Sequence, residues 1–305
     1  MTTLRQAADE AVFTISSMLG DWAISLRAQG KSELTIVSYR QVAENLDRYL
    51  EQQGMPRAVA SIRREHVEAW LAAMGDKAPA TRAKCYRSAQ QLFKWLIDEG
   101  ETQVNPMDRM KPPKVPTKPV PIITDDELTR LLRSCAGVSF ENRRDTAMMR
   151  LLLDTGMRAS ELIGLRVEDV DLSLGLARVT GKGGHERVAP FGPKTSEAVR
   201  RYLRARTRAG RGSDGPLWLG KKGPLTDSGL RQLLERRGKD AGVEGLHPHR
   251  FRHTLAHRWL SAGGQETDLM RIAGWRSRQM VERYGASAAD ARAVEAHKRM
   301  GLGEI

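Results

Sequence analysis

The sequence predicts a mainly helical fold with a small β-sheet, an α+β chain with a four-helix N-terminal domain and a larger C-terminal domain. Apolar residues recur at helical spacing through the first hundred residues. Six of the seventeen residues at 105–121 are prolines, which cannot continue a helix. Between 165 and 192 the apolar period changes to two, which is typical of strands. We therefore expect a helical domain at 1–104, a linker at 105–121 and a second domain at 122–305.

The N-terminal domain contains four predicted helices. In the first, Leu19, Trp22, Ala23 and Leu26 form an apolar stripe at helical spacing. A glycine stands near the end of each helix as a stop signal. The helices are expected at roughly 5–28, 33–53, 63–74 and 79–99, followed by Gly30, Gly54, Gly75 and Gly100.

The fourth helix carries unexpected charge in its first half, where Arg82, Lys84 and Arg87 stand with Asp76 as the only nearby acid. Positive charge near a helix N-terminus opposes the helix dipole, so helix stability does not explain it. Contact with phosphates outside the protein explains it, and a solvated helix face is the alternative. These three residues are candidate phosphate contacts.

The linker is basic as well as proline-rich, because Lys111, Lys114 and Lys118 are interleaved with its prolines. A proline-rich segment is extended and semi-rigid. Such a connector suits a protein whose two domains close round a charged rod. The three lysines are therefore further candidate phosphate contacts.

The second domain opens with a capping box, in which Thr124 and Glu127 satisfy each other's first-turn amides. Two strands, at 176–180 and 186–190, are joined by a glycine-rich segment at 181–184. Glycines there permit positive φ and a close approach of backbone to a ligand. Helices are expected at about 125–135, 142–155, 193–208, 226–241, 254–260 and 288–300.

Two positions in this domain carry charges suited to an anion. Arg158 stands between two helices, and Glu161 one turn later can hold it while the guanidinium faces a phosphate. An ordinary surface pair, worth at most about 1 kcal/mol, is the alternative. Lys182 at the hairpin tip can swing into a neighbouring site, although turns often carry an exposed lysine.

A third basic group lies near residue 250, where His249, Arg252 and His253 share one helical face over a single turn. Two imidazoles and a guanidinium suit an anion. Zinc is a second interpretation, but no glutamate follows His249 as the HExxH pattern requires, and Arg250 and Arg252 would repel a cation. A solvated basic helix is the third.

Composition points to a nucleic-acid partner. The chain of 305 residues has a net charge of +13, and residues 119–305 hold 33 basic against 23 acidic residues. Such an excess favours a polyanion. No apolar run approaches the roughly 18 residues that span a bilayer, so no membrane partner is expected.

The compartment and the cofactors can also be predicted. The N-terminus has no secretion signal, so a cytoplasmic protein is expected. Cys85 and Cys135 belong to different helices without a CxxC pattern, and we expect both to be structural thiols. Neither a Walker A sequence nor an acidic metal cluster appears, so no cofactor and no metal are expected.

Four segments in this order resemble the tyrosine recombinase (phage integrase) family over nearly the whole chain: TGMRASEL, GKGGHERVAP, HPHRFRHTLAH and AGWRSRQMVERYG. The residues that match the family's boxes are Arg158, Lys182, His249, Arg252, Trp275 and Tyr284. The resemblance implies a core-binding helical domain ahead of a catalytic domain. It also implies site-specific cleavage and rejoining of duplex DNA through a 3′-phosphotyrosyl intermediate and a Holliday junction.

The resemblance assigns roles to the nucleophile and the proton-transfer groups. Tyr284 would attack the phosphate, and His249 would take its proton or stabilise the departing charge. Lys182 would protonate the 5′-hydroxyl leaving group. Because the phosphotyrosine bond conserves energy for rejoining, neither ATP nor metal is needed.

Other residues would bind the phosphate or support those that do. Arg158 and Arg252 would clamp the non-bridging oxygens, where charge accumulates in the transition state. Trp275 would donate a hydrogen bond to the phosphate and close the pocket. Glu161 and His253 would hold the active-site groups in position without contacting the phosphate themselves.

Two positions depart from the usual family pattern. Most relatives carry histidine where this chain has Trp275, and an indole can donate a hydrogen bond but cannot shuttle a proton. His185 stands where lysine is common, and its role is open. The chain also begins directly with the core-binding domain, so no additional arm-binding domain is expected.

The resemblance leaves several activities and partners open. Integration or excision of a phage or mobile element is favoured, with Xer-like dimer resolution, type IB topoisomerase-like nicking and closing, and non-catalytic sequence-specific DNA binding as alternatives. The expected partners are double-stranded DNA with inverted half-sites and three further copies of the chain. The tetramer on DNA would form through the C-terminal helix. A directionality factor or a host DNA-bending protein is a further possible partner.

Overall fold

The computed structural model describes residues 13–116, 121–181 and 184–300, and only the backbone at 283–288, 290–292 and 295. The chain divides into two compact units, residues 1–117 and 118–305. The expected fold class is confirmed, because helices dominate and the described strands form one small sheet. No helix among the described residues is long and apolar enough to cross a membrane.

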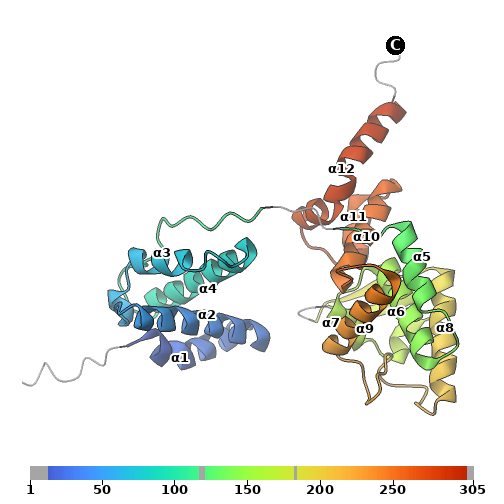
Figure 1. The fold of residues 1–305 in the computed structure, drawn as a ribbon, viewed down its shortest axis with the longest axis horizontal. Helices are drawn as coiled ribbons and strands as arrows, with labels where there is room; N and C mark the ends of the chain where they lie inside the picture. The colour runs from blue at the N-terminus through green and yellow to red at the C-terminus, as the bar shows by residue number, and fades with distance from the viewer. Residues whose placement is uncertain (1–12, 117–120, 182–183, 301–305) are drawn as a thin grey trace, which may run out of the picture. The chain divides into compact units, whose positions relative to one another are not determined.

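The N-terminal unit is a helical bundle around three buried tryptophans (Figure 1). Trp22 stacks on Tyr39 with ring centroids 5.8 Å apart, and the Trp70 indole donates to Asn45 Oδ1 at 2.9 Å. Its elements are α1 (Ile15–Ala28), α2 (Glu33–Gln52), the 3-10 turn η1 (Val59–Ser61), α3 (Arg64–Ala72) and α4 (Pro79–Asp98).

Helix α1 begins later than the expected residue 5. Thr14 has an extended backbone, and its side chain accepts from the Ser17 N–H, which fixes the first turn at Ile15. Residues 5–12 lie outside the described part of the chain. The other three helices agree with the expected ranges to within one or two residues.

The proline-rich stretch starts within the first unit. Residues 106–109 form a turn, Met107 is buried in the helical core, and Tyr86 Oη donates to the Met110 carbonyl at 2.6 Å. Within the described linker, residues 105, 110–116 and 121 form neither a helix, a strand nor a turn. The expectation of an extended connector from residue 105 is therefore wrong for its first part, because Met107 supplies apolar surface that the bundle buries.

The second unit combines helices with a three-stranded antiparallel sheet in the order β1-β2-β3. Val179 pairs with Arg187 and Thr180 with Glu186 in its register. Its helices are α5 (Asp125–Ser134), α6 (Phe140–Thr155), α7 (Ala159–Gly164), η2 (Val167–Asp169), α8 (Pro193–Arg208), α9 (Asp227–Ala241), α10 (Pro248–Ser261), α11 (Glu266–Ala273) and α12 (Arg278–Met300). The strands are β1 (Val170–Asp171), β2 (Leu176–Thr180) and β3 (Glu186–Pro190).

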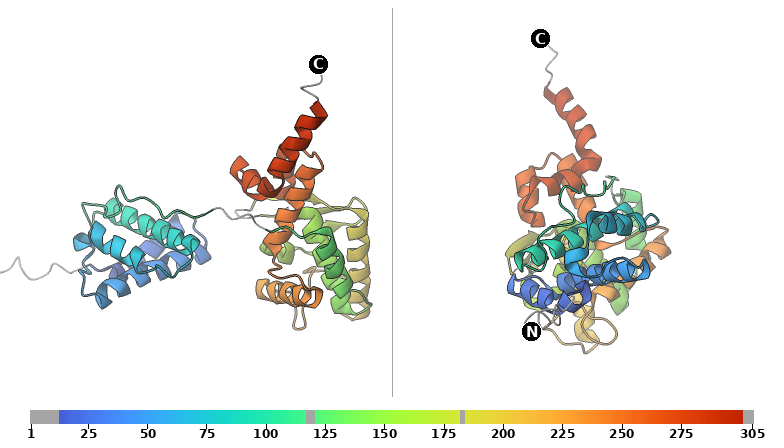
Figure 2. Two further views of the ribbon diagram at one scale, coloured as in Figure 1. Left: turned by 45° about the horizontal axis from the view of Figure 1, so that its top comes forward. Right: turned by 90° about the vertical axis from the view of Figure 1, so that its left-hand side faces the viewer.

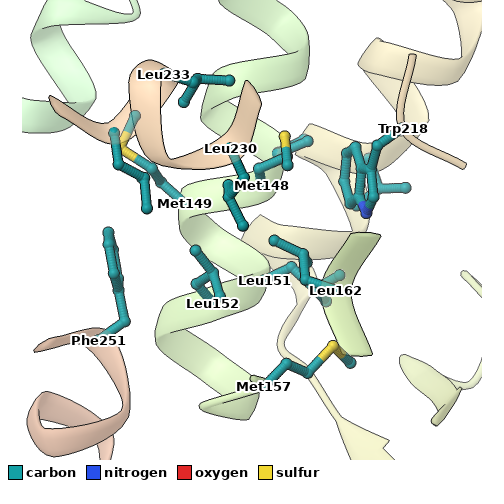
Figure 3. Packing of buried hydrophobic residues seen from close by; sticks show 14 of the residues in the cluster. Met148, Met149, Leu151, Leu152, Met157, Leu162, Trp218, Leu230, Leu233 and Phe251 are labelled. Atoms are coloured by element: carbon teal, nitrogen blue, oxygen red, sulfur yellow. The ribbon is translucent and has the colours of Figure 1, made fainter. Parts of the chain in front are cut away.

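Helix α6 packs against both α8 and α10 in this unit, which Figure 2 shows from two further sides. Four of its own side chains are fully buried, those of Met148, Met149, Leu151 and Leu152 (Figure 3). Burying each such side chain contributes about 1.5–3 kcal/mol. Since α6 ends at Gly156, this core fixes the position of the segment that carries Arg158.

Three expectations for the second unit need correction. The helix expected at 254–260 begins at Pro248, whose fixed φ suits a first turn. Helix α11 was not expected. The terminal helix expected at 288–300 is the second half of one helix, α12, which begins at Arg278. Gly285 and Ser287 do not interrupt it, since an interior glycine costs only about 1 kcal/mol relative to alanine.

Candidate functional site

The site is organised around the buried carboxylate of Glu161. Its side chain is 2% exposed and stands in the first turn of α7. Oε2 accepts from the Arg158 backbone N–H at 2.9 Å, and Oε1 accepts from Arg158 Nη1 at 2.6 Å. The pair expected from the spacing is therefore present, and it fixes a guanidinium that is 37% exposed.

A second arginine binds the same carboxylate. Arg187 Nη2 in β3 donates to Glu161 Oε2 at 2.7 Å, and the Arg187 side chain is 12% exposed. The side chain also lies against Gly274, where an added Cβ would stand 2.8 Å from Arg187 Nε. Arg187 thus connects α7 to the end of α11.

Sequence reasoning missed Arg187, although the strand pattern contains a signal for it. Alternation in β3 puts Arg187 on the same face as Ala189, which is fully buried. A charged side chain on the buried face of a strand needs a partner. The partner, Glu161, lies 26 positions earlier, so no local spacing reveals it.

Arg252 is held on the other side of the site. Its side chain is buried in α10, and Nη1 donates to the Gly156 carbonyl at 2.6 Å while Nη2 donates to the Ala273 carbonyl. Its guanidinium carbon lies 5.1 Å from the centre of the Trp275 ring, and Trp275 is also buried. These contacts fix the plane of the guanidinium.

Gly156 permits this arrangement. Its φ is +55°, and an added Cβ would stand 2.7 Å from Leu255 Cδ2 and 3.6 Å from the Arg252 Cα. Glycine adopts positive φ without a steric penalty. The end of α6 can therefore lie directly on α10.

The contacts join residues of α7, β3 and α10 and of the ends of α6 and α11 into a ring. In order, Arg158 contacts Glu161, Glu161 contacts Arg187, Arg187 lies on Gly274 beside Trp275, Trp275 stacks with Arg252, and Arg252 binds Gly156. The structure thus brings together four of the predicted residues, Arg158, Glu161, Arg252 and Trp275. We call this group the arginine ring.

The histidines lie on the same helix as Arg252. His249 is exposed in the first turn of α10, with its ring centroid 6.3 Å from that of His247. His253 is buried one turn further on. Burial, together with Arg250, lowers the pKa of His247.

Helix α10 is anchored from behind by Arg250. Its buried guanidinium donates to the Ile122 carbonyl at 3.0 Å and to the Glu244 carbonyl at 2.7 Å, and it pairs with Glu127 at 2.7 Å. Glu127 also accepts from the Thr124 N–H, so the expected capping box is present. One carboxylate therefore both caps α5 and ties it to α10.

Part of the predicted site lies outside the described residues. Lys182 and Lys118 belong to segments that are not described. The backbone of Tyr284 lies in α12, which packs on α10, but its side chain is not described. His185 is exposed, and its carbonyl accepts from the Gly181 N–H at 2.7 Å, closing the hairpin that carries Lys182.

The candidate phosphate contacts of the first unit lie on α4 and in the segment that follows it. Lys84 and Arg87 are exposed, and Arg82 is half-buried. Lys84 lines a cavity of about 490 Å³ together with Arg48, Lys77 and Asp76. Lys111 and Lys114 are exposed in the irregular segment.

The site is suited to binding an oxyanion. Burial raises the pKa of Glu161, but the Arg158 N–H, Arg187 and the Arg158 guanidinium outweigh it and hold the pKa below its ordinary value. Glu161 is therefore ionised, and the two arginines bound to it leave a net charge of +1. No group of three or more histidine, cysteine or acidic residues within 13–116, 121–181 and 184–300 could hold a metal ion.

Comparisons with known proteins agree over both units. The sequence model of the Phage integrase family matches residues 121–290, and that of the phage integrase N-terminal SAM-like domain matches residues 20–100. The tyrosine recombinase XerC of Corynebacterium efficiens is 30% identical over 259 residues, which cover 84% of this chain and 81% of that protein.

Solved structures show the same fold. XerH site-specific recombinase bound to palindromic difH substrate, in a post-cleavage complex, is 18% identical with a TM-score of 0.72, covering 95% of this chain and 85% of that one. A lambda integrase tetramer bound to a Holliday junction is 17% identical with a TM-score of 0.67, covering 87% and 78% of the two chains.

Proposed function

This chain belongs to the phage integrase family and is a tyrosine recombinase, and from that premise we propose that it cuts and rejoins duplex DNA at paired inverted half-sites with Tyr284 as nucleophile. Residues 122–305 perform the chemistry and residues 1–104 bind the DNA, with the segment from Lys111 to Pro121 as the connector. The palindromic substrate in the XerH complex supports the inverted half-sites.

The proposed chemistry distributes charge over the arginine ring. Arg158 presents a partly exposed guanidinium to the non-bridging oxygens, and Arg252 supplies a second, fixed by its two carbonyl contacts. Removing one donor of this kind costs on the order of 10²–10³ in rate, because charge develops on those oxygens in the transition state. The arginine ring is the observation that carries this proposal, since it orients both guanidinia before any phosphate arrives.

Proton transfer is assigned to groups outside the ring. Tyr284 must lose its proton to attack, and His249, exposed at the start of α10, accepts it or stabilises the charge. Lys182 protonates the departing 5′-oxygen, which leaves as a hydroxyl. Trp275 contributes packing and a hydrogen-bond donor but no proton acceptor.

The first unit and the linker supply the remaining DNA contacts. Lys84, Arg87, Lys111 and Lys114 are exposed, which suits phosphate binding. Arg82 and Lys118 complete the proposed set. Removing one phosphate contact should reduce the salt dependence of binding: the slope of the logarithm of the binding constant against the logarithm of the salt concentration should fall by about one.

The nucleophile gives the direct test. Tyr284→Phe should bind DNA as wild type does, because it loses one hydroxyl, but it should form no covalent adduct. The assay is denaturing electrophoresis with a labelled half-site duplex that the wild-type chain has selected from a random pool. EDTA is present and nucleotide is absent, since the proposed chemistry uses neither. An adduct in the variant, or a requirement for added metal, would contradict the proposal.

Two biological roles are supported by different observations. Trp275, where most relatives have histidine, favours integration or excision of a phage or mobile element. The similarity to XerC favours dimer resolution of a chromosome or plasmid. Sequencing the DNA beside the gene separates them, because an integrase gene lies next to its own attachment site and a dimer resolvase acts on a site in the replicon itself.

Assembly as a tetramer through α12 is the final part of the proposal. The second half of this helix exposes Val294 and Met300, which are 55% and 64% accessible. Exposed apolar residues on a helix end suit a protein contact. The lambda integrase tetramer on a Holliday junction supports the same stoichiometry.

A further inference from the structure

Two arginines share one carboxylate in the arginine ring, but their surroundings differ. Arg158 is 37% exposed and contacts Oε1 of Glu161, whereas Arg187 is 12% exposed and contacts Oε2. Arg158 is therefore accessible to a ligand from solvent. Arg187 is enclosed between Glu161 and Gly274.

The charge of Glu161 determines how strongly Arg158 can bind an anion. A carboxylate that is 2% exposed has little water to screen it. Without a second cation, its whole charge would act on Arg158, and an oxyanion would have to compete with it for the same guanidinium. A buried cation on the opposite oxygen removes that competition.

Arg187 also carries a feature that a purely structural ion pair does not need. Its Nη1 is buried and has no hydrogen-bond partner among the described protein atoms. Burial works against the charged form of this guanidinium, and Glu161 works for it. Leaving a buried donor of a charged group unsatisfied is unfavourable, so the pair with Glu161 satisfies only part of this guanidinium.

We propose that Arg187 is a positioning residue that neutralises Glu161, so that Arg158 is held in place and still presents positive potential to the scissile phosphate. This inference rests on the proposed function, in which Arg158 binds that phosphate. Glu161 thus lies between two cations: Arg187 neutralises its charge, and Arg158 binds the phosphate.

The test combines a variant that removes the charge of Arg187 with a second change that removes the opposing charge of Glu161. Arg187→Met removes the charge and keeps much of the volume, and Glu161→Gln removes the opposing charge while keeping a hydrogen-bonding group. Single-turnover cleavage is measured on the selected half-site duplex, nicked beside the scissile phosphate so that the cut strand cannot religate. Binding and thermal unfolding are measured in parallel.

We expect Arg187→Met to cleave about 10²-fold more slowly than wild type, because Arg158 would then be lost as a transition-state donor, while its DNA affinity changes about threefold or less. The double variant Arg187→Met/Glu161→Gln should cleave at least tenfold faster than Arg187→Met, because Arg158 is released from the unbalanced carboxylate. Arg187→Lys should remain within about tenfold of wild type, because it retains the charge. Arg200→Met is the control, since Arg200 pairs with Glu197 on the exposed side of α8 and should change nothing.

Three results would overturn the inference. One is a folded double variant that is no faster than Arg187→Met, which would show that the losses do not arise from Glu161. If Arg187→Met does not fold, the second result is a hundredfold loss of cleavage rate in a folded Arg187→Lys. Arg158→Ala separates the two levels: an active Arg158→Ala refutes the proposed function, whereas an inactive Arg158→Ala beside a fully active Arg187→Met refutes only the role of Arg187.

Discussion

At the scale of single residues, Glu161 affects both catalysis and stability, because its ionised carboxylate holds two arginines in place. Its pKa is lower in the folded chain than the ordinary value of 4.5. A carboxylate with a depressed folded pKa contributes stability above its unfolded pKa. That contribution is lost as the pH falls through the folded pKa.

The difference in unfolding free energy between wild type and Glu161→Gln should therefore be largest at neutral pH and should shrink below about pH 4.5. Denaturant unfolding of both chains from pH 7 to pH 3 measures it. Other titrating groups are common to both chains and cancel in the difference. A difference that is constant over this range would show that folding does not lower the pKa of this carboxyl group.

Gly156 is the second residue with a predictable effect. Gly156→Ala would strain a positive φ and press on Leu255, so it should destabilise the chain by about 1–3 kcal/mol and slow cleavage by shifting the carbonyl that holds Arg252. Gly242→Ala is the matched control, because its φ is +63° and nothing lies within 4 Å of an added Cβ. The control should cost about 1 kcal/mol and leave cleavage unchanged. Equal cleavage rates in both variants would contradict the role of this contact.

At the scale of elements, α5 and α10 are joined by one buried and one exposed ion pair. Arg250→Met would remove the buried guanidinium that pairs with the partly exposed Glu127, and it should cost up to the roughly 3–5 kcal/mol of a fully buried pair. Arg258→Met breaks the pair with the exposed Asp125 between the same helices and should cost less than about 1 kcal/mol. Denaturant unfolding of the full chain compares them. Similar losses in both would mean that burial of the Arg250 pair adds nothing.

The elements that the sequence predicted correctly are those with strong local signals. Strands β2 and β3 were placed correctly because alternation and the glycine-rich turn define both ends. Helix α11 was missed because only eight residues separate its start from Gly274. Helix α12 was predicted only from residue 288, because Gly285 and Ser287 resemble a stop and a cap, although backbone propensity tolerates both inside a long helix.

The candidate site was predicted to the extent that its contacts are local. Glu161 and Arg158 are three positions apart, so helical spacing was enough to pair them. The contacts of Arg252 with Gly156 and of Arg187 with Glu161 join distant segments, and only folding brings them together. Helical spacing therefore indicated an anion-binding role for Arg252 but not its partners, the resemblance identified Trp275, and Arg187 was not identified.

At the scale of the whole molecule, assembly is the property most open to test. Val294→Glu with Met300→Glu should leave single-site binding intact and abolish synapsis of two sites, because both side chains are exposed on the second half of α12. Leu174→Glu, at an exposed turn between β1 and β2, is the control for added charge. Native gel electrophoresis with one and with two half-site pairs gives the result. Normal synapsis by the double variant would show that α12 does not form the interface between protomers.

The continuity of α12 has a mechanical consequence. Val281 is buried against α10 and α11, whereas the helix beyond it runs away from both (Figures 1 and 2). Measured along the helix from Val281, residue 284 lies about 4.5 Å away and residue 300 about 28 Å away, at about 1.5 Å per residue. If the rod pivots at Val281, a swing of about 6 Å at its tip moves the backbone at residue 284 by about 1 Å. A misplacement of that size can change a reaction rate about a hundredfold. A neighbouring protomer that grips the tip would therefore operate a lever with a ratio of about six to one, which would switch one active site on or off without touching it.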